Sequence, residues 1–208
     1  MADDQRITSI LVAHQDYRGL FAVGLDSAER GELQPFQRNA GHFTRPAFAR
    51  KFSGALLRHW LDAVHAQFTG AAADPHWQRY FDLAHQCSAS ETLITLAGYD
   101  AHLNVDVAEG LADAGVTLAD EPDYQKIVRV VEASSPTLIS ATRSAYGVNL
   151  EPVWQVVLAL AAPITGAAFA NGLALRSPGL APAAEVELTA LWRGTDAAFP
   201  ALIALYGG

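Results

Sequence analysis

The sequence predicts an all-α fold on three observations. Apolar residues recur at helical spacing along almost the whole chain. Alternating runs joined by hairpin turns are missing, and Asn171-Gly172, a dipeptide that often forms such turns, lies inside an Ala-rich segment. The chain has 208 residues, of which 50% are hydrophobic, so it is long enough to bury a substantial core. We therefore expect a single helical domain over residues 1–208, a bundle of about eight helices.

The helical pattern divides into separate stretches along the chain. They cover residues 5–13, 16–31, 45–69, 75–86, 90–114, 121–147, 151–175 and 182–205.

Residues typical of helix ends mark the boundaries of the third, fourth and fifth expected helices. The third helix is expected to begin at Thr44-Arg-Pro46 and to end at Gly70. Asp74-Pro75 marks the start of the fourth helix, Ser90-Glu91 the start of the fifth, and Gly115 the end of the fifth.

Proline shapes the expected helices of the second half. The sixth helix is expected to begin at Glu121-Pro122, and Ser134-Ser-Pro136 is expected to kink or divide it. Pro163 is expected to kink or break the seventh helix, which is the most apolar stretch of the chain. Polar residues interrupt that stretch and flanking basic anchors are missing, so we interpret it as a core helix that does not enter a membrane.

Charge and cysteine content exclude several functions and indicate a compartment. The net charge is -8 with only 14 Lys and Arg residues, which argues against binding to nucleic acid or to an anionic membrane surface. Cys87 is the single cysteine, so no intrachain disulfide forms. The amino-terminal residues are acidic and lead into no apolar signal segment, which predicts a cytoplasmic protein.

The segment from Leu96 to Ala108 looks most like a functional site, because polar side chains interrupt an apolar run there. In an α-helix, which turns about 100° per residue, His102 and Asp106 lie one turn apart on one face. This face forms a stripe of polar character, composed of Thr95, Tyr99, His102, Asp106, Glu109 and Asp113. The stripe is either a site or simply the solvated side of the helix.

Asp100 and Asn104 form a second pair on the opposite, apolar face of that helix. A carboxylate on a core face costs several kcal/mol unless it is paired or protonated. Asp100 therefore needs a partner such as Asn104, a structural hydrogen bond or a function.

The helix expected over 45–69 carries a second candidate pair. His59 shares its face with apolar residues and points inward, and Asp62 lies partly toward the same face. The pair could oppose His102 and Asp106 across the bundle, as a metal centre or as a metal-free acid/base site. The remaining histidines are expected on the surface or at helix ends: His14, His42, His65, His76 and His85. No nucleotide-binding or Ser-nucleophile motif is found in the sequence.

The segment Gly98-Tyr-Asp-Ala-His-Leu-Asn-Val-Asp-Val107 resembles the Gly-x-Asn-Ala-His-Ile-Asn-x-Asp-Leu signature of a bacterial helical family, domain-of-unknown-function family 5995. Phe48-Ala-Arg-Lys-Phe52 and Pro75-His-Trp77 fit the same family, and the resemblance covers about residues 15–112. It implies a helical fold and names no reaction.

The resemblance also bears on single residues of the site. It implies that His102, Asn104 and Asp106 are motif residues. Asp100 stands where the family signature has Asn, so a titratable carboxylate replaces an amide and could serve as an added acid or base.

From these observations we expect an enzyme of specialised metabolism that acts on a small, largely apolar molecule by acid/base chemistry without a cofactor. A cyclase, isomerase or lyase fits this description. His102 would transfer the proton, and Asp106 would orient the His102 ring. Asp100 would be a second acid or base. The expected substrate-binding residues are Tyr99, Asn104, His59 and Trp60.

Two other functions remain open. The first is a hydrolase or oxidase that depends on a divalent transition metal, with the ligands His102, Asp106, His59 and Asp62. The second is a noncatalytic ligand-binding or scaffold protein. The apolar helix over 182–205 is either part of the core or the face of a homodimer.

Overall fold

Helices form all the regular secondary structure of the computed structural model, which describes residues 2–206 and shows no strand among them. The α-helices are, in chain order, α1 (Ala2–Ala13), α2 (Leu20–Ala28), α3 (Gln34–Arg38), α4 (Pro46–Thr69), α5 (Pro75–Ala84), α6 (Glu91–Ala101), α7 (Val107–Asp113), α8 (Glu121–Ala133), α9 (Ser135–Tyr146), α10 (Glu151–Leu175) and α11 (Ala181–Tyr206). Shorter turns are 3-10 helices at η1 (Tyr17–Gly19), η3 (Ala40–His42) and η5 (Leu118–Asp120) and π-helices at η2 (Glu29–Leu33) and η4 (His102–Asp106). The prediction of an all-α domain of about eight helices is confirmed.

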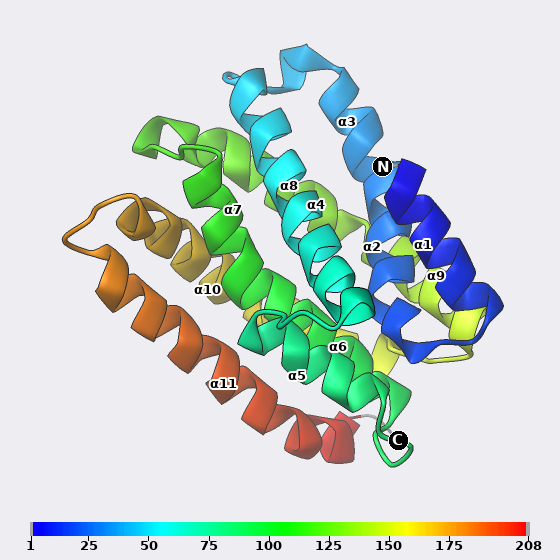
Figure 1. The fold of residues 1–208 in the computed structure, drawn as a ribbon. Coiled ribbons are helices and arrows are strands. Elements are labelled where there is room, and N and C mark those ends of the chain that lie inside the picture. Colours follow the sequence, from blue (N-terminus) through cyan, green and yellow to red (C-terminus); the bar gives the residue numbers. More distant parts are fainter. Residues whose placement is uncertain (1, 207–208) are drawn as a thin grey trace.

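A continuous helical rod formed by α6, η4 and α7 lies at the centre of the molecule (Figure 1). It packs against α2, α4 and α5 and, on another side, against α10 and α11. Neighbours on several sides bury the middle of the rod, including both polar pairs of the sequence motif. The motif therefore lies where its polar groups must be satisfied by protein or by a ligand.

Proline has different effects on the expected helix boundaries. The second helix continues past residue 31 to Arg38, through the π turn η2. Pro35 lies in the first turn of α3, where its missing N–H is tolerated. The expected division after residue 133 is confirmed, since α8 ends there and Pro136 begins the next helix. Pro163, by contrast, does not break α10, which continues from Glu151 to Leu175.

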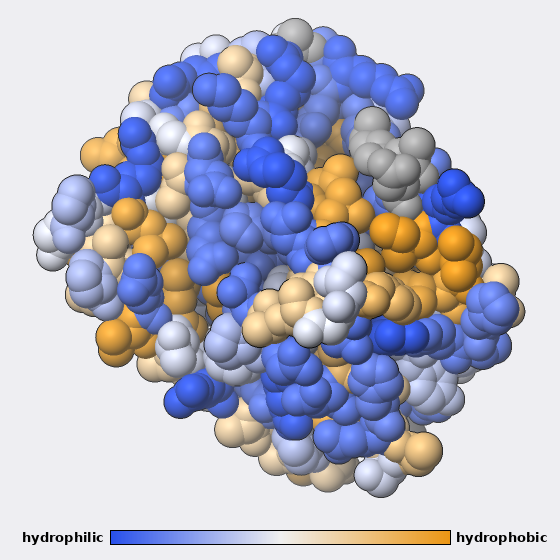
Figure 2. Space-filling view, in the orientation of Figure 1, coloured by the Kyte–Doolittle hydropathy of each residue, from blue (hydrophilic) through white to orange (hydrophobic). Residues whose placement is uncertain are grey.

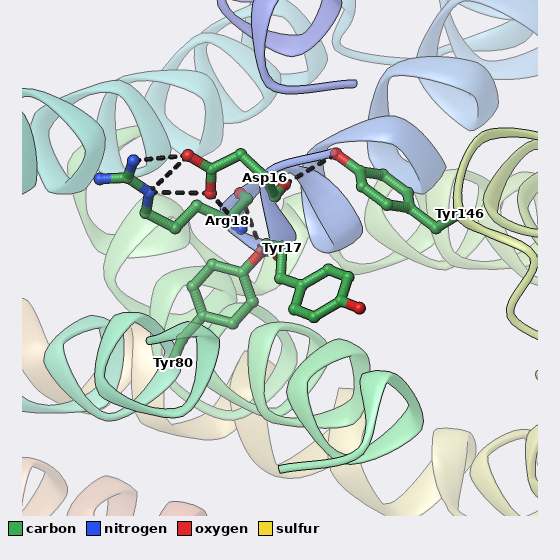
Figure 3. Close-up of polar contacts among 5 residues, drawn as sticks. All are labelled: Asp16, Tyr17, Arg18, Tyr80 and Tyr146. Carbon is green, nitrogen blue, oxygen red and sulfur yellow. Dashed lines mark hydrogen bonds and ion pairs between the residues drawn. The ribbon is translucent and has the colours of Figure 1, made fainter. Parts of the chain in front are cut away.

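Backbone contacts from two distant tyrosines fix the start of α2 (Figure 3). The Tyr80 hydroxyl of α5 donates to the Arg18 carbonyl at 2.9 Å and accepts from the Phe21 N–H at 3.2 Å. The Tyr146 hydroxyl of α9 donates to the Asp16 carbonyl at 2.9 Å. These bonds hold the Phe21 ring in the core, where its centroid lies 5.4 Å from that of His102. The aromatic core thus sets one wall of the site.

The helix α10 is less buried than the sequence indicated. Among residues 2–206 it is the helix long and apolar enough to cross a membrane by length and composition, and 28% of its apolar window is buried. It lies between α7 and α11, and the remaining side carries exposed residues such as Ala159, Leu160 and Pro163. Leu188 and Phe199 of α11 are buried, so this helix contributes to the core.

The surface over α4 differs in polarity from the surface over α1. Figure 2 shows hydrophilic side chains over most of α4 on the face that it presents, and hydrophobic side chains gathered over α1 on the right. Ile10 of α1 is half exposed. The motif residues lie below this surface, so their access depends on the cavities described next.

Candidate functional site

Asp106 is the most deeply buried carboxylate of the site, with 0% of its surface exposed. Its Oδ1 accepts a hydrogen bond from the Trp77 indole Nε1 at 3.1 Å and lies 3.1 Å from His76 Nε2. Both partners come from the first turn of α5, which begins at Pro75, directly after Asp74. Burial by itself raises the pKa of Asp106, but the two neighbouring imidazoles, His102 and the hydrogen-bonded His76, outweigh it and hold the pKa below its ordinary value. Asp106 is therefore a carboxylate kept ionised inside the protein.

His102 faces the other oxygen of this carboxylate. Its Nδ1 lies 3.5 Å from Asp106 Oδ2, a separation longer than an ordinary hydrogen bond. The pairing that the sequence predicted for His102 and Asp106 is thus present, and both side chains are buried.

The His102 ring lines two cavities that adjoin each other. The larger has a volume of about 450 Å³ and is lined by residues of α1, α2, η2, α3 and the first half of α4. The smaller has a volume of about 110 Å³ and is walled mainly by apolar side chains of α8, α9 and α10. Both cavities share the lining residues Leu25, Glu29, Leu56 and His102. A small molecule bound across them would contact the imidazole.

A group of carboxylates in the larger cavity was not anticipated from the sequence. Asp4, Asp26 and Glu29 line it together, and Asp4 Oδ1 accepts a hydrogen bond from Trp60 Nε1 at 3.1 Å. Burial, with the charges of Asp4 and Asp26, raises the pKa of Glu29 to about 7. No local pattern points to this group, because its members come together only when α1 packs on α2.

Asp100 and Asn104 lie on another side of the central rod, as the angular count predicted. Asn104 Nδ2 donates to Asp100 Oδ1 at 2.6 Å, while Asp100 Oδ2 has no hydrogen-bond partner among residues 2–206. Burial raises the pKa of Asp100 to about 8, against the opposing effect of the Asn104 hydrogen bond. The pair lines a third cavity of about 40 Å³ between α6, α10 and α11, which shares lining residues with the smaller cavity at His102, although neither Asp100 nor Asn104 lines the cavities at His102. Tyr99 lines both this cavity and the smaller one at His102.

His59 reaches the site, but not with the partner expected for it. Its Nδ1 lies 3.6 Å from Glu109 Oε2 and its Nε2 3.3 Å from Asp113 Oδ2, both on α7. Asp62 is exposed and makes no ion pair within the described part of the chain, so the expected pair of His59 and Asp62 does not form. His59 and Asp62 lie about one helical turn apart on α4. The neighbouring α7 packs against α4 and supplies the carboxylates near His59.

Three side chains of the site, one of them Asp106, could hold a metal ion. His59, Asp106 and Glu109 each offer a ligand atom, and these atoms lie within 4.8 Å of one another. This set shares His59 and Asp106 with the ligands expected from the sequence, contains Glu109, and includes neither His102 nor Asp62. Trp60, expected to bind substrate, is fully buried in the aromatic core and reaches the larger cavity only through its bond to Asp4.

His76 is the site residue that the sequence analysis misplaced. It was expected on the surface or at a helix end, yet it is buried and bonded to Asp106. A signal was present: His76 and Trp77 share one face of α5 with Tyr80 and Phe81, all buried. The interpretation of the stripe around His102 as a solvated face is also wrong for Thr95, Tyr99, His102 and Asp106, which are buried, and holds only at its end, where Glu109 is partly exposed and Asp113 is exposed.

Comparisons with known proteins place the chain in a family without assigning a reaction. No curated protein and no solved structure matches it. The family match covers residues 5–174, so it extends well beyond the residues 15–112 that carry the motif resemblance and includes most of α10. The chain belongs to the Family of unknown function (DUF5995).

Proposed function

We propose that this protein is an enzyme that moves protons on a small, largely apolar molecule bound beside His102. One observation carries the proposal: the imidazole lies between a buried, ionised carboxylate and two cavities. This is the arrangement that general acid/base catalysis needs, because the carboxylate orients the ring and the free edge meets the substrate.

Each buried partner has a defined part in this chemistry. Asp106 holds the His102 ring and stabilises the imidazolium that forms when the ring takes a proton. His76 and Trp77 hold Asp106 in turn, so the carboxylate does not need to reorganise during the reaction. His102 takes a proton from one atom of the substrate and returns it to another, which suffices for an isomerisation, a cyclisation or an elimination. Such reactions on apolar molecules are typical of specialised metabolism.

Of the residues expected from the sequence, only His102 transfers protons in this mechanism, and Asp106 orients its ring. Asp100 and Asn104 line a third cavity, so a role for Asp100 as the second acid or base would need the substrate to extend past Tyr99 and Leu103, which line both that cavity and the smaller one at His102. Tyr99 stays a proposed substrate-binding residue because it lines the smaller cavity at His102.

Deuterium transfer from solvent tests the proposal directly. The purified protein is incubated in D2O with a panel of small apolar compounds, and mass spectrometry follows deuterium uptake or a change of isomer. We expect uptake with the wild type and its loss in His102→Ala. The control is His65→Ala, which removes an exposed histidine of the same chain. Equal uptake by wild type and a folded His102→Ala protein would reject the proposal, and saturable binding without any turnover would favour the noncatalytic alternative.

A metal-dependent enzyme is a second candidate, supported by the proximity of His59, Asp106 and Glu109. Imidazole and carboxylate ligands suit Zn²⁺ and Mn²⁺. Elemental analysis of the purified protein separates the two candidates. A stoichiometric transition metal that is lost in Glu109→Gln would support the metal-dependent enzyme, whereas metal-free protein that retains deuterium transfer would reject it.

A further inference from the structure

Glu29 and His102 are the two titratable side chains that line both cavities of the site. Leu25 and Leu56 complete the shared lining, so segments of α2, η2, α4 and η4 surround the junction between the cavities. No hydrogen bond or ion pair joins Glu29 to His102 in the described chain, which leaves the space between them to a ligand. A molecule that extends from one cavity into the other therefore passes both groups.

Glu29 differs from the other two carboxylates of the larger cavity in having no partner among residues 2–206. Asp4 accepts a hydrogen bond from Trp60 Nε1 at 3.1 Å, and Asp26 forms an ion pair with Arg30. The Glu29 side chain is only partly buried, and neither of its oxygens is closed off from the cavity. Its carboxyl group can therefore exchange a proton with a ligand.

The His102 ring presents its second nitrogen to the same space. Nδ1 faces Asp106 and is closed off from water, whereas Nε2 is not closed off and has no hydrogen-bond partner among residues 2–206. Because the residue is only 7% exposed, a molecule reaches Nε2 through the cavities that the ring lines. The open nitrogen and the Glu29 carboxyl group thus meet the same ligand.

Both residues also begin a π turn. The described part of the chain has two such turns, and η2 starts at Glu29 as η4 starts at His102. In each turn the N–H of the residue five positions on, Gln34 or Val107, bonds to the carbonyl of that first residue. A π turn is rare and is frequently found at a functional site. Two of them, far apart in the sequence, here meet at one junction.

The charges around Glu29 keep part of it protonated near neutral pH. Burial, with the negative charges of Asp4 and Asp26, raises the pKa of Glu29 to about 7. The other charged or titratable groups at the two cavities are the exposed Arg38 and Arg50, Glu132 and His102, with Arg30 paired to Asp26. Glu29 is therefore present both as an acid and as a carboxylate, and a general acid is most effective in this range.

We infer that Glu29 is a second catalytic residue, which gives a proton to one end of the substrate while His102 takes a proton from the other. This inference rests on the proposed function, because it adds a proton donor to the same site. Without Glu29, the His102 ring has to carry the proton from one atom of the substrate to another by itself.

The transfer balances without an oxidant, a reductant or a second reactant. His102 Nε2 takes a proton from a carbon next to a double bond, and the C–H electron pair forms a new double bond to the neighbouring atom. The π pair of the old double bond moves to its far atom, which takes the proton of the Glu29 carboxyl group. The product is an isomer of the substrate, and proton exchange with water through the larger cavity restores both side chains.

Two covalent labels test whether the two groups face one space. Dicyclohexylcarbodiimide, an apolar reagent, adds to protonated carboxyl groups, and diethylpyrocarbonate acylates open imidazole nitrogens. Peptide mass spectrometry locates both labels on the full chain at neutral pH. We expect the carbodiimide to label Glu29 and then to protect His102 from acylation, while the exposed His65 still reacts.

Glu32→Gln is the matched control, because it changes an exposed glutamate of the same π turn. It should label like the wild type, whereas Glu29→Gln should lose the carbodiimide label and leave His102 reactive. The inference is overturned if Glu29 takes no label, or if His102 reacts equally before and after Glu29 is labelled.

Isomerisation of cyclohex-3-enone to cyclohex-2-enone in D2O tests the catalytic role. His102 would take the proton from C2, and C4 would receive one from Glu29. We expect the wild type to place solvent deuterium at C4, because the carboxyl proton exchanges with water. Glu29→Gln should lower the rate by roughly 10²–10⁴-fold, and its residual product should retain more of the original hydrogen, since His102 alone returns it.

The pH profile gives a second reading of the same variant. The rate of the wild type should fall as the pH rises above about 7, because Glu29 loses the proton that it donates. This decline should be missing in Glu29→Gln and unchanged in Glu32→Gln. An equal rate, deuterium content and pH profile in the wild type and Glu29→Gln would overturn the inference.

The two experiments distinguish a failure of this inference from a failure of the proposed function. Turnover that requires His102 and is unchanged in Glu29→Gln would reject the role of Glu29 and leave the proposed function intact. The expected labelling in a wild type that turns over neither cyclohex-3-enone nor the apolar panel would reject the proposed function, and the catalytic role of Glu29 with it.

Discussion

His76 Nε2 lies 3.1 Å from Asp106 Oδ1, and both side chains are buried although 30 residues separate them in the sequence. The contact joins the first turn of α5 to the π turn η4. Because Trp77 donates to the same oxygen, the start of α5 holds the carboxylate that faces His102. Residues outside the motif thus decide the orientation of its acidic group.

Asp106→Asn should destabilise the protein, because the amide removes the charge that His76, Trp77 and His102 surround. Hydrogen bonds to a buried charge contribute more than neutral ones, so we expect a loss of roughly 2–4 kcal/mol in the free energy of unfolding. Denaturant titration measures it. The control Asp62→Asn changes an exposed carboxylate and should stay within about 0.5 kcal/mol. An unchanged midpoint for Asp106→Asn would show that the carboxylate is not a buried anchor.

Asp100→Asn should make the protein more stable at alkaline pH. The pKa of Asp100 is about 8 in the folded protein and near its ordinary value of 3.8 in the unfolded chain. The folded state therefore binds the proton more tightly, and the stability present below pH 4 is lost as the pH rises toward and through 8. Thermal unfolding should show a gain on the order of 5 kcal/mol for the variant at pH 9 and little change at pH 4. Parallel pH profiles for the two proteins would contradict the burial of an uncompensated carboxylate.

Tyr99→Phe should stabilise the unliganded protein, by roughly 1 kcal/mol, because it removes a buried hydroxyl that has no partner. Tyr80→Phe is the matched comparison. Its hydroxyl bonds to the backbone of Arg18 and Phe21, so the same chemical change should cost about 1–3 kcal/mol. Chemical denaturation of both variants without ligand measures the contrast. A loss of stability in Tyr99→Phe equal to that in Tyr80→Phe would mean that the Tyr99 hydroxyl is already satisfied.

Gly98→Ala should destabilise the protein by roughly 2–4 kcal/mol. A Cβ at this position would lie 2.7 Å from the Phe21 Cβ, so the packing of α2 on α6 would have to shift. Gly194→Ala is the control on another helix, where a Cβ would meet no atom within 4 Å. There the higher helix propensity of Ala should add up to about 1 kcal/mol. In thermal unfolding we expect the melting temperature to fall for Gly98→Ala and to rise for Gly194→Ala. Equal shifts of the melting temperature would contradict the close contact at Gly98.

The same contact explains why the motif begins with glycine. Gly98 lets α2 approach α6, and this approach brings Phe21 to the His102 ring, 5.4 Å between centroids. The sequence showed a glycine within a helical run, but the neighbour that requires it belongs to a segment more than 70 residues earlier. Tertiary packing alone supplies that neighbour.

The π turn at the motif is another feature that the pattern of apolar residues does not reveal. The Val107 N–H bonds to the carbonyl of His102, five residues back, so His102–Asp106 turns differently from the α-helix assumed in the angular count. The count still predicted the pairs correctly, since His102 faces Asp106 and Asn104 bonds to Asp100. Residues four apart remain close in either kind of helix.

The sequence by itself determined the helices and the two polar pairs of the motif, because periodicity, helix ends and spacing within one turn are local properties. Only the tertiary structure decided the partners: His76 and Trp77 for Asp106, α7 rather than Asp62 for His59, and separate cavities for His102 and Asp100. These contacts depend on the angles and distances at which the helices pack. Many side chains together set this packing geometry, so no single residue of the sequence predicts it.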